Sequence, residues 1–161
     1  FSQLFHSFKP KEISLEIDGL VSVCQKLSST NTGALIVLER NVPLDFVTET
    51  GDKVNIEFCE PIIESIFYKN SPLHDGAIVI RDNHIIATRV ILPVVGENQL
   101  PKRYGLRHRA AISITEKTDA TALVVSEETG RISYFKGGSF VKYKDIANLI
   151  ELIKQDFRLI S

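Results

Sequence analysis

The sequence predicts an α/β protein of α+β-like type, with a single mixed, twisted β-sheet and helices packed around it. Apolar runs of strand length alternate along the chain with segments whose apolar residues recur every three or four positions. Two pairs of these runs are joined by short polar turns, as in β-hairpins, which argues against an all-parallel sheet. The length of 161 residues is that of one domain.

The first expected element is a helix over residues 10–30, because its apolar residues share one helical face. The polar stretch that ends in Gly33 reads as a helix stop and a turn. Residues 34–38 form a continuous apolar run, which predicts a strand covered on both faces. Residues 43–52 are polar and irregular and are expected to connect elements, whereas residues 61–68 predict a short helix with a proline in its first turn.

The middle of the chain predicts a hairpin followed by a helix. Residues 77–80 and 85–92 are rich in β-branched side chains and flank the polar turn 81–84. Residues 93–101 are expected to be a loop. A helix is predicted over residues 104–117, where two consecutive alanines favour helix near its start.

The last part of the chain repeats this order. Residues 120–126 and 131–135 flank the turn 127–130, which predicts a second hairpin. The glycine pair at 137–138 is expected to be a flexible turn. A final helix is predicted over residues 143–160, because its apolar residues lie on one face.

Composition and charge argue against several classes of function. The formal net charge is −1, which does not fit a broad basic face, so we expect no nucleic-acid partner. No stretch of the sequence approaches the ~20 apolar residues of a membrane-spanning helix. Cys24 and Cys59 lack the spacing of a metal site and are expected to be free thiols.

An acid beside a glycine lies where a strand is about to begin. Asp75 and Gly76 fall between Pro72 and the apolar run that starts at Ala77, and strand mouths are where α/β proteins place ligands. A carboxylate there can hold Mg²⁺ or Mn²⁺ or accept a proton from a hydroxyl group, and the neighbouring His74 can ligate a softer divalent ion. The alternative is a plain turn, because Asp-Gly is a common turn pair.

Three potentially cationic residues, Arg107, His108 and Arg109, fall in the first turn of the helix predicted after Gly105. Cations at this end oppose the helix macrodipole, which favours anions. Unpaired N–H groups, the dipole and arginines at one spot describe a phosphate site. The alternative is a solvated basic turn. Successive helix positions point about 100° apart, so these side chains do not all face one ligand.

The turn of the second hairpin carries a pair of acids within Ser126-Glu127-Glu128-Thr129-Gly130. A paired acid at a hairpin tip is ordinarily just a polar turn. The functional interpretation is that one glutamate supplies a second metal carboxylate. An acid, a cation cluster and a second acid together make the chain a candidate for nucleotide chemistry at a metal-and-phosphate site.

The two clusters together resemble the catalytic domain of the diadenylate cyclases (DAC), the bacterial enzymes that make cyclic di-AMP. Residues 75–77 match the Asp-Gly-Ala motif of that family, and residues 107–109 match its Arg-His-Arg motif. The preceding segments 70–74 and 101–105 are similar to the family as well, and so is the segment 124–130. The resemblance implies the diadenylate cyclase fold.

The resemblance runs from about residue 11 to residue 150 and implies a domain organisation. We expect residues 1–10 to be a membrane-proximal stub and residues 11–161 to be the diadenylate cyclase catalytic domain. The likeness is strongest to the membrane-anchored, CdaA-type subgroup, in which this domain follows transmembrane helices. The full-length protein is then expected at the cytoplasmic face of the cell membrane, anchored through a missing N-terminal segment, with this chain as a soluble cytosolic fragment. A packed N-terminal segment is the alternative for the aromatic start at Phe1.

The resemblance also implies a reaction and a set of site residues. The family joins two ATP molecules head to tail, because the 3′-hydroxyl of each attacks the α-phosphate of the other and two pyrophosphates leave. The family match assigns catalysis to Asp75, Arg107, His108 and Arg109. It assigns nucleotide binding to Gly76, Ala77, Leu92, Leu106, Arg107, Ser126 and Glu127. It assigns the metal ligands to Asp75, Glu128 and His74.

The resemblance further implies a cofactor and partners. The cofactor is a divalent metal, Mg²⁺ or Mn²⁺, with Co²⁺ as a third candidate. Each site binds one ATP while the product contains two, so the expected partner is a second copy in a transient or stable face-to-face homodimer. Regulatory protein partners are also compatible with the subgroup.

The sequence departs from the family pattern in one helix. Leu106 stands where the family usually has a threonine before Arg-His-Arg, and Ser113 and Thr115 replace a Gly-x-Ser pattern. The missing hydroxyl group at position 106 keeps open a nucleotide-binding regulatory module without turnover. A metal-dependent phosphohydrolase that acts on a single nucleotide is the third hypothesis.

Overall fold

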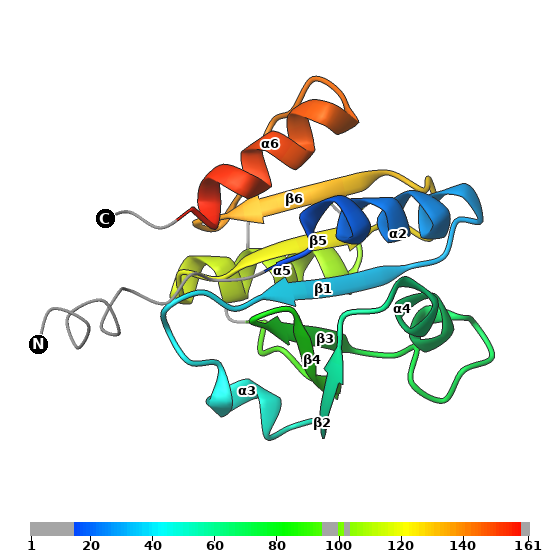
Figure 1. The fold of residues 1–161 in the computed structure, drawn as a ribbon, viewed down its shortest axis with the longest axis vertical. Coiled ribbons are helices and arrows are strands. Elements are labelled where there is room, and N and C mark those ends of the chain that lie inside the picture. Colours follow the sequence, from blue (N-terminus) through cyan, green and yellow to red (C-terminus); the bar gives the residue numbers. More distant parts are fainter. Residues whose placement is uncertain (1–14, 95–99, 102–103, 159–161) are drawn as a thin grey trace, which may run out of the picture.

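A mixed β-sheet forms the centre of the fold, with helices on both of its faces (Figure 1). The computed structural model describes residues 15–94, 100–101 and 104–158. The membrane-proximal stub expected at residues 1–10 lies outside the described residues, as do Lys102 and Arg103. Within the described ranges, no helix has the length and apolar character needed to cross a bilayer.

In the described chain, seven strands pair in the order β2-β4-β3-β1-β5-β6-β7. The strands β1 and β3 run parallel, and all other neighbours in this order are antiparallel. The mixed sheet and both predicted hairpins, β3–β4 and β5–β6, are therefore confirmed. The strands are β1 (Ala34–Leu38), β2 (Asp52–Glu57), β3 (Ala77–Arg81), β4 (His84–Val90), β5 (Thr121–Val125), β6 (Ile132–Lys136) and β7 (Ser139–Phe140).

The helices form a layer on each face of the sheet. Residues of α2, α4 and α6 share one apolar cluster with the strands, and residues of α3 and α5 share the other. Consecutive residues of β1 alternate between these clusters, which explains its unbroken apolar run. The helices are α2 (Ile17–Ser29), α3 (Asp45–Thr48), α4 (Glu60–Phe67), α5 (Leu106–Lys117) and α6 (Ile146–Asp156).

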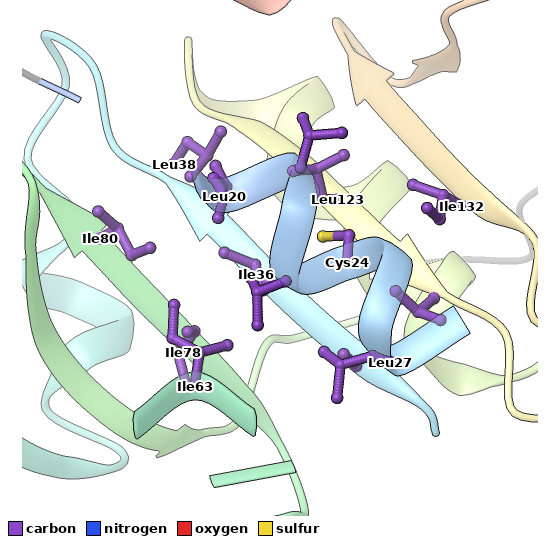
Figure 2. Packing of buried hydrophobic residues seen from close by; sticks show 14 of the residues in the cluster. Leu20, Cys24, Leu27, Ile36, Leu38, Ile63, Ile78, Ile80, Leu123 and Ile132 are labelled. Atoms are coloured by element: carbon purple, nitrogen blue, oxygen red, sulfur yellow. The ribbon is translucent and has the colours of Figure 1, made fainter. Parts of the chain in front are cut away.

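The larger cluster lies between α2 and the sheet (Figure 2). Leu20, Cys24 and Leu27 recur at helical spacing and pack with Ile36 of β1 and Leu123 of β5. Full burial of one such aliphatic side chain contributes about 1.5–3 kcal/mol. Burial in this cluster also raises the pKa of the Cys24 thiol to about 12. Both cysteines are free, as the sequence predicts.

Three elements of the fold were not predicted from the sequence. The segment expected to connect elements contains α3 and the start of β2. β2 is an edge strand whose residues are all partly or fully exposed, so its apolar pattern is weak. β7 follows Gly137 and Gly138, whose positive φ closes the turn, and a two-residue strand is too short to carry a pattern.

Three helices begin later than predicted, and α5 does so by two residues because it starts at Leu106. Glu16 has a non-helical conformation and precedes the first helical residue, Ile17. The last helix starts only at Ile146, because the side chain of Asp145 accepts a hydrogen bond from the backbone N–H of Asn148 and caps it there.

A bulge in β4 bends the sheet close to the strand's end, where the pairing register with β3 shifts. Arg89 has a φ of 52°, and its Nη2 donates to Asp52 Oδ1 at 3.0 Å. Two glycines pack against this bulge. A Cβ at Gly51 would lie 2.2 Å from the carbonyl oxygen of Thr88, and one at Gly76 would lie 2.8 Å from the carbonyl carbon of Arg89.

Candidate functional site

A cavity of about 510 Å³ gathers most of the predicted site residues. It is lined by the turn before β3, the end of β4, the first turn of α5 and the turn between β5 and β6. The acid cluster and the arginine cluster therefore face the same space, although they are far apart in the sequence. The predicted residues that line the cavity are Asp75, Gly76, Leu92, Leu106, Arg107, His108, Ser126, Glu127 and Glu128.

Asp75 presents its carboxylate to the cavity with a side chain that is 85% exposed. His74 lies beside it, with Nε2 at 3.3 Å from Asp75 Oδ1. The Nδ1 atom of His74 lies 2.8 Å from the carbonyl oxygen of Ser71, which leaves Nε2 as the ring nitrogen that faces the Asp75 carboxylate. His74 is not among the lining residues, and its link to the cavity runs through Asp75.

The two residues after Asp75 are constrained by packing. Gly76 has a φ of +83°, and the main chain of Arg89 occupies the space that a side chain would need. The glycine is therefore required by the neighbouring strand, independently of any ligand. Ala77 is buried between the sheet and α5, so its side chain lies in the core and outside the cavity lining.

The first turn of α5 brings one arginine to the cavity. Gly105 is the N-cap and supplies no side-chain hydrogen bond, so the first N–H groups of the helix remain for other acceptors. Arg107 lines the cavity, and its Nη1 lies 3.7 Å from Glu127 Oε1. Leu106 lines it too and is 78% exposed. Positive charge and a helix start without a side-chain cap thus meet at one side of the cavity.

Arg109 points in another direction. Its Nη2 lies 3.5 Å from the carbonyl oxygen of Pro101, and the residue is not part of the cavity lining. Two positions along a helix turn a side chain by about 200°. Of the two arginines in the motif, Arg107 is the one that faces the cavity.

His108 is buried among aromatic rings. Its ring centroid lies 5.1 Å from that of Tyr104, 6.2 Å from that of Phe135 and 6.4 Å from that of Phe140. Burial lowers the pKa of His108, and the positive charge of Arg107 lowers it further. The imidazole is therefore neutral at neutral pH, where it can offer a hydrogen bond to a ligand but not a charge.

The turn between β5 and β6 is organised by Ser126. Its Oγ accepts hydrogen bonds from the backbone N–H groups of Glu128 and Thr129, both at 3.2 Å. As an acceptor in both bonds, the hydroxyl keeps its own hydrogen for a ligand. The turn presents Glu127 and Glu128 to the cavity opposite Arg107.

Asp75 and Glu128 are the predicted metal carboxylates that line the cavity. Across the part of the chain that the structure describes, no group of three or more His, Cys, Asp or Glu side chains is arranged to hold a metal ion. Mg²⁺ in nucleotide sites is usually held by one or two carboxylates together with substrate phosphates. The donors present therefore fit an ion that binds with a nucleotide rather than one held by protein alone.

The cavity also has an apolar wall that was not predicted from the sequence. Ile91 and Val94 are exposed apolar residues just after β4. The sequence indicates them by apolar residues that continue past Val90, the end of β4, on both sides of Pro93. Such a wall suits the flat face of a planar ligand group. The lining residues without a predicted role are Leu35, Val90, Ile91, Val94, Gly105, Ala110 and Val125.

Comparison with known proteins identifies the family to which this chain is similar. Residues 21–140 match the family described as DisA bacterial checkpoint controller nucleotide-binding (DAC). The chain is 46% identical over 119 residues to diadenylate cyclase CdaS of Bacillus thuringiensis (strain BMB171), covering 74% of this chain and 59% of that protein. It is 33% identical over 142 residues to cyclic di-AMP synthase CdaA of Bacillus subtilis (strain 168), covering 88% and 52%. The chain thus spans little more than half the length of these relatives.

Solved structures agree with the sequence matches. A crystal structure of a double mutant of DacA from Staphylococcus aureus aligns with a TM-score of 0.83 at 33% identity, covering 88% of this chain and 94% of that one. The structure of a hypothetical membrane spanning protein from Bacillus cereus aligns with a TM-score of 0.75 at 43% identity, covering 79% and 62%. The region that matches the family model, residues 21–140, contains every segment that lines the cavity. The chain belongs to the diadenylate cyclase family.

Proposed function

We propose that this protein condenses two ATP molecules into cyclic di-AMP and two pyrophosphates. The observation that carries the proposal is that Asp75, Arg107 and the acidic turn at Ser126–Glu128 line one and the same cavity. A carboxylate opposite a cationic, uncapped helix start is the arrangement that phosphoryl transfer between nucleotides requires. The names of the curated relatives support the same reaction.

Each half of the reaction forms one bond and breaks one. The 3′-oxygen of one ATP bonds to the α-phosphorus of the other, and the bond from that phosphorus to the oxygen that bridges to the β-phosphorus breaks. Pyrophosphate leaves with that bridging oxygen, and the 3′-hydroxyl loses its proton. The exposed carboxylate of Asp75 is the proposed acceptor of this proton.

The proposed triphosphate site lies at the start of α5. Arg107, the uncapped N–H groups of the first helical turn and the Ser126 hydroxyl can all meet the charge that develops on the leaving pyrophosphate. Neutral His108 would add a hydrogen bond. Arg109 would join only after its side chain turns away from the Pro101 carbonyl group.

Asp75 and Glu128 would hold a divalent ion, Mg²⁺, Mn²⁺ or Co²⁺, together with phosphate oxygens, and His74 would contribute through Nε2. When bound, the ion neutralises phosphate charge and polarises the α-phosphate. The nucleoside would lie along the apolar side of the cavity. Its proposed contacts are Gly76, Leu92 and Leu106, with Glu127 and the main chain of Ala77 nearby.

The reaction requires a second copy of the chain, because one cavity serves one ATP and the product contains two nucleotides. Ile91, Val94 and Leu106 are exposed apolar residues of the cavity lining, an arrangement that suits burial against a partner. We therefore propose a face-to-face homodimer as the catalytic species. Two triphosphates brought together repel each other, and the arginines and metal ions offset this repulsion.

We further propose that residues 11–161 are the catalytic domain of a longer protein anchored at the cytoplasmic face of the membrane, with residues 1–10 as a membrane-proximal stub. The likeness to the hypothetical membrane spanning protein of Bacillus cereus and the match to CdaA support this proposal. Regulatory proteins would then act on the anchored form. A membrane-fraction assay of the complete protein tests it.

The second candidate function is ATP binding without turnover. The observation that favours it is Leu106, which lines the cavity and is largely exposed at a position where a hydroxyl group would meet a nucleotide. A leucine there can pack against a base but cannot donate a hydrogen bond to phosphate. Calorimetric binding of ATP without cyclic di-AMP in the product mixture would identify this function, whereas AMP or phosphate would identify a hydrolase.

The substitution Asp75→Asn tests the proposal directly. We expect it to lower the rate of cyclic di-AMP formation by about 10²-fold or more, because the amide neither accepts the hydroxyl proton nor binds a metal ion well. The measurement is product formation from ATP with Mn²⁺ or Mg²⁺, read by mass spectrometry. Asp18→Asn, which removes an exposed ion pair between Asp18 of α2 and Lys154 of α6, is the matched control. Wild-type rates in Asp75→Asn would show that the carboxylate is not part of the reaction.

A further inference from the structure

The guanidinium group of Arg107 lies against a glycine from a segment that carries no predicted site residue. Gly33 ends the turn between α2 and β1 and precedes Ala34, the first residue of β1. A Cβ at position 33 would lie 2.6 Å from Nη1, 2.8 Å from Cζ and 3.2 Å from Nη2 of Arg107. The arginine head thus occupies the space that a side chain at this position would take.

The main chain at Gly33 does not itself require glycine. Gly33 is not among the glycines with positive φ, and its three closest obstacles all belong to the flexible end of Arg107. This differs from Gly51 and Gly76, where a Cβ would meet the backbone of β4. An alanine at position 33 would therefore displace the guanidinium group and leave the fold in place.

The turn that contains Gly33 also supports the opposite side of the cavity. The Nδ2 of Asn31 donates to the carbonyl oxygen of Glu128 at 3.4 Å, and the hydroxyl of Ser28 donates to that of Gly130. The two turns lie side by side at one end of the sheet (Figure 1). One short segment thus fixes both the arginine and the acidic turn with which it pairs.

We propose that Gly33 is a positioning residue for polyphosphate binding: by carrying no side chain, it sets the place at which Arg107 meets the phosphates. Glu127, at 3.7 Å from Nη1, limits the guanidinium group from another direction. The inference rests on the proposed function, in which Arg107 contacts the triphosphate. A displacement of about 1 Å in such a group can cost two orders of magnitude in rate.

A double-mutant cycle tests this coupling. The proteins are wild type, Gly33→Ala, Arg107→Ala and the double variant, with Gly19→Ala in the first turn of α2 as a glycine control. ATP and tripolyphosphate affinities are measured by calorimetry, and cyclic di-AMP formation is measured with Mn²⁺. We expect Gly33→Ala to weaken both affinities about tenfold, with the melting temperature within about 2 °C of wild type. In the Arg107→Ala background, the same change is expected to have no further effect.

Equal losses of affinity in the two backgrounds would overturn the inference, and so would wild-type affinity in Gly33→Ala. If Gly33→Ala lowers the melting temperature strongly, the double variant must restore it, because it lacks the Arg107 side chain against which the new Cβ packs. If the double variant does not restore the melting temperature, the backbone itself requires glycine at position 33, and the proposal is overturned. A wild type that binds ATP but makes no cyclic di-AMP refutes the proposed function alone. A wild type that binds neither ATP nor tripolyphosphate refutes both.

Discussion

Three adjacent residues at the start of α5 occupy three different environments. Arg107 lies between Gly33 and Glu127 at the cavity, His108 is enclosed by aromatic rings, and Arg109 reaches the Pro101 carbonyl group. Their division follows from helix geometry, because consecutive side chains point about 100° apart. A motif of three cations therefore contributes one charged group to the cavity, a neutral imidazole beside it and one side chain directed elsewhere.

The burial of His108 gives stability a defined pH dependence. Because burial and the charge of Arg107 hold the pKa of His108 below its usual 6.5, the unfolded chain takes up a proton more readily than the folded chain. This contribution to stability is complete above about pH 6.5 and is lost as the pH falls through that value toward the folded pKa. We expect the melting temperature of wild type to fall more steeply than that of His108→Gln between about pH 7 and pH 5. Parallel profiles would contradict a buried neutral imidazole.

The elements that build the cavity are held in place by close backbone contacts. The bulge in β4 directs Val90 and the following residues toward the cavity, and it is packed between Gly51 and Gly76 while Asp52 holds the side chain of Arg89. The uncapped start of α5 and the turn after β5 complete the opposite side. The cavity is thus a product of strand and helix ends rather than of one continuous motif.

Gly51→Ala tests the role of the bulge at the level of the sheet. A Cβ at this position would lie 2.2 Å from the carbonyl oxygen of Thr88 and 3.0 Å from the backbone nitrogen of Val90, so the main chain must move. We expect the free energy of unfolding to fall by about 2–3 kcal/mol. Urea denaturation measures it. Gly19→Ala is the control, because the three atoms nearest to its Cβ would belong to the side chains of Phe58 and Glu60 and not to the main chain. A change below about 0.5 kcal/mol would show that the bulge relaxes freely.

At the scale of the whole molecule, the fold presents its cavity at the surface and surrounds it with exposed apolar side chains. Ile91 and Leu106 are 69% and 78% exposed, although apolar side chains of this size are favoured in contact with other apolar groups. The proposed product contains two nucleotides, whereas the described part of one chain offers one cavity that gathers these side chains. The proposed homodimer would account for both the exposed apolar residues and the second nucleotide.

Dilution tests the proposed dimer without any substitution. If catalysis needs two opposed subunits, the rate of cyclic di-AMP formation per subunit is expected to fall as the protein concentration falls below the dissociation constant of the pair. Initial rates over a wide range of protein concentration at saturating ATP and fixed metal measure it. Sedimentation over the same range gives the population of the pair. A specific activity that does not change with concentration while the pair dissociates would contradict the proposal.

Local patterns predict much of this fold because they depend on neighbours in the chain. The strand β1, both hairpins and the cores of α2, α4, α5 and α6 follow from periodicity and turn residues. The edge strand β2 and the two-residue β7 do not, because pairing with another strand rather than their own pattern defines them. The motifs likewise predict that Asp75 and Arg107 belong to one site, and helix geometry predicts that the neighbouring cationic side chains diverge, but it does not predict which of them faces the site.

The sequence by itself determined the mixed class of the sheet, the positions of its main elements and the identity of the groups that can carry charge near a nucleotide. Only the tertiary structure decided that Arg107 rather than Arg109 faces the cavity, that His108 is buried and neutral, and that Gly33 bounds the arginine. The physical reason is that these properties arise from contacts between segments distant in the chain. Burial, ring packing and steric exclusion exist only once those segments have met.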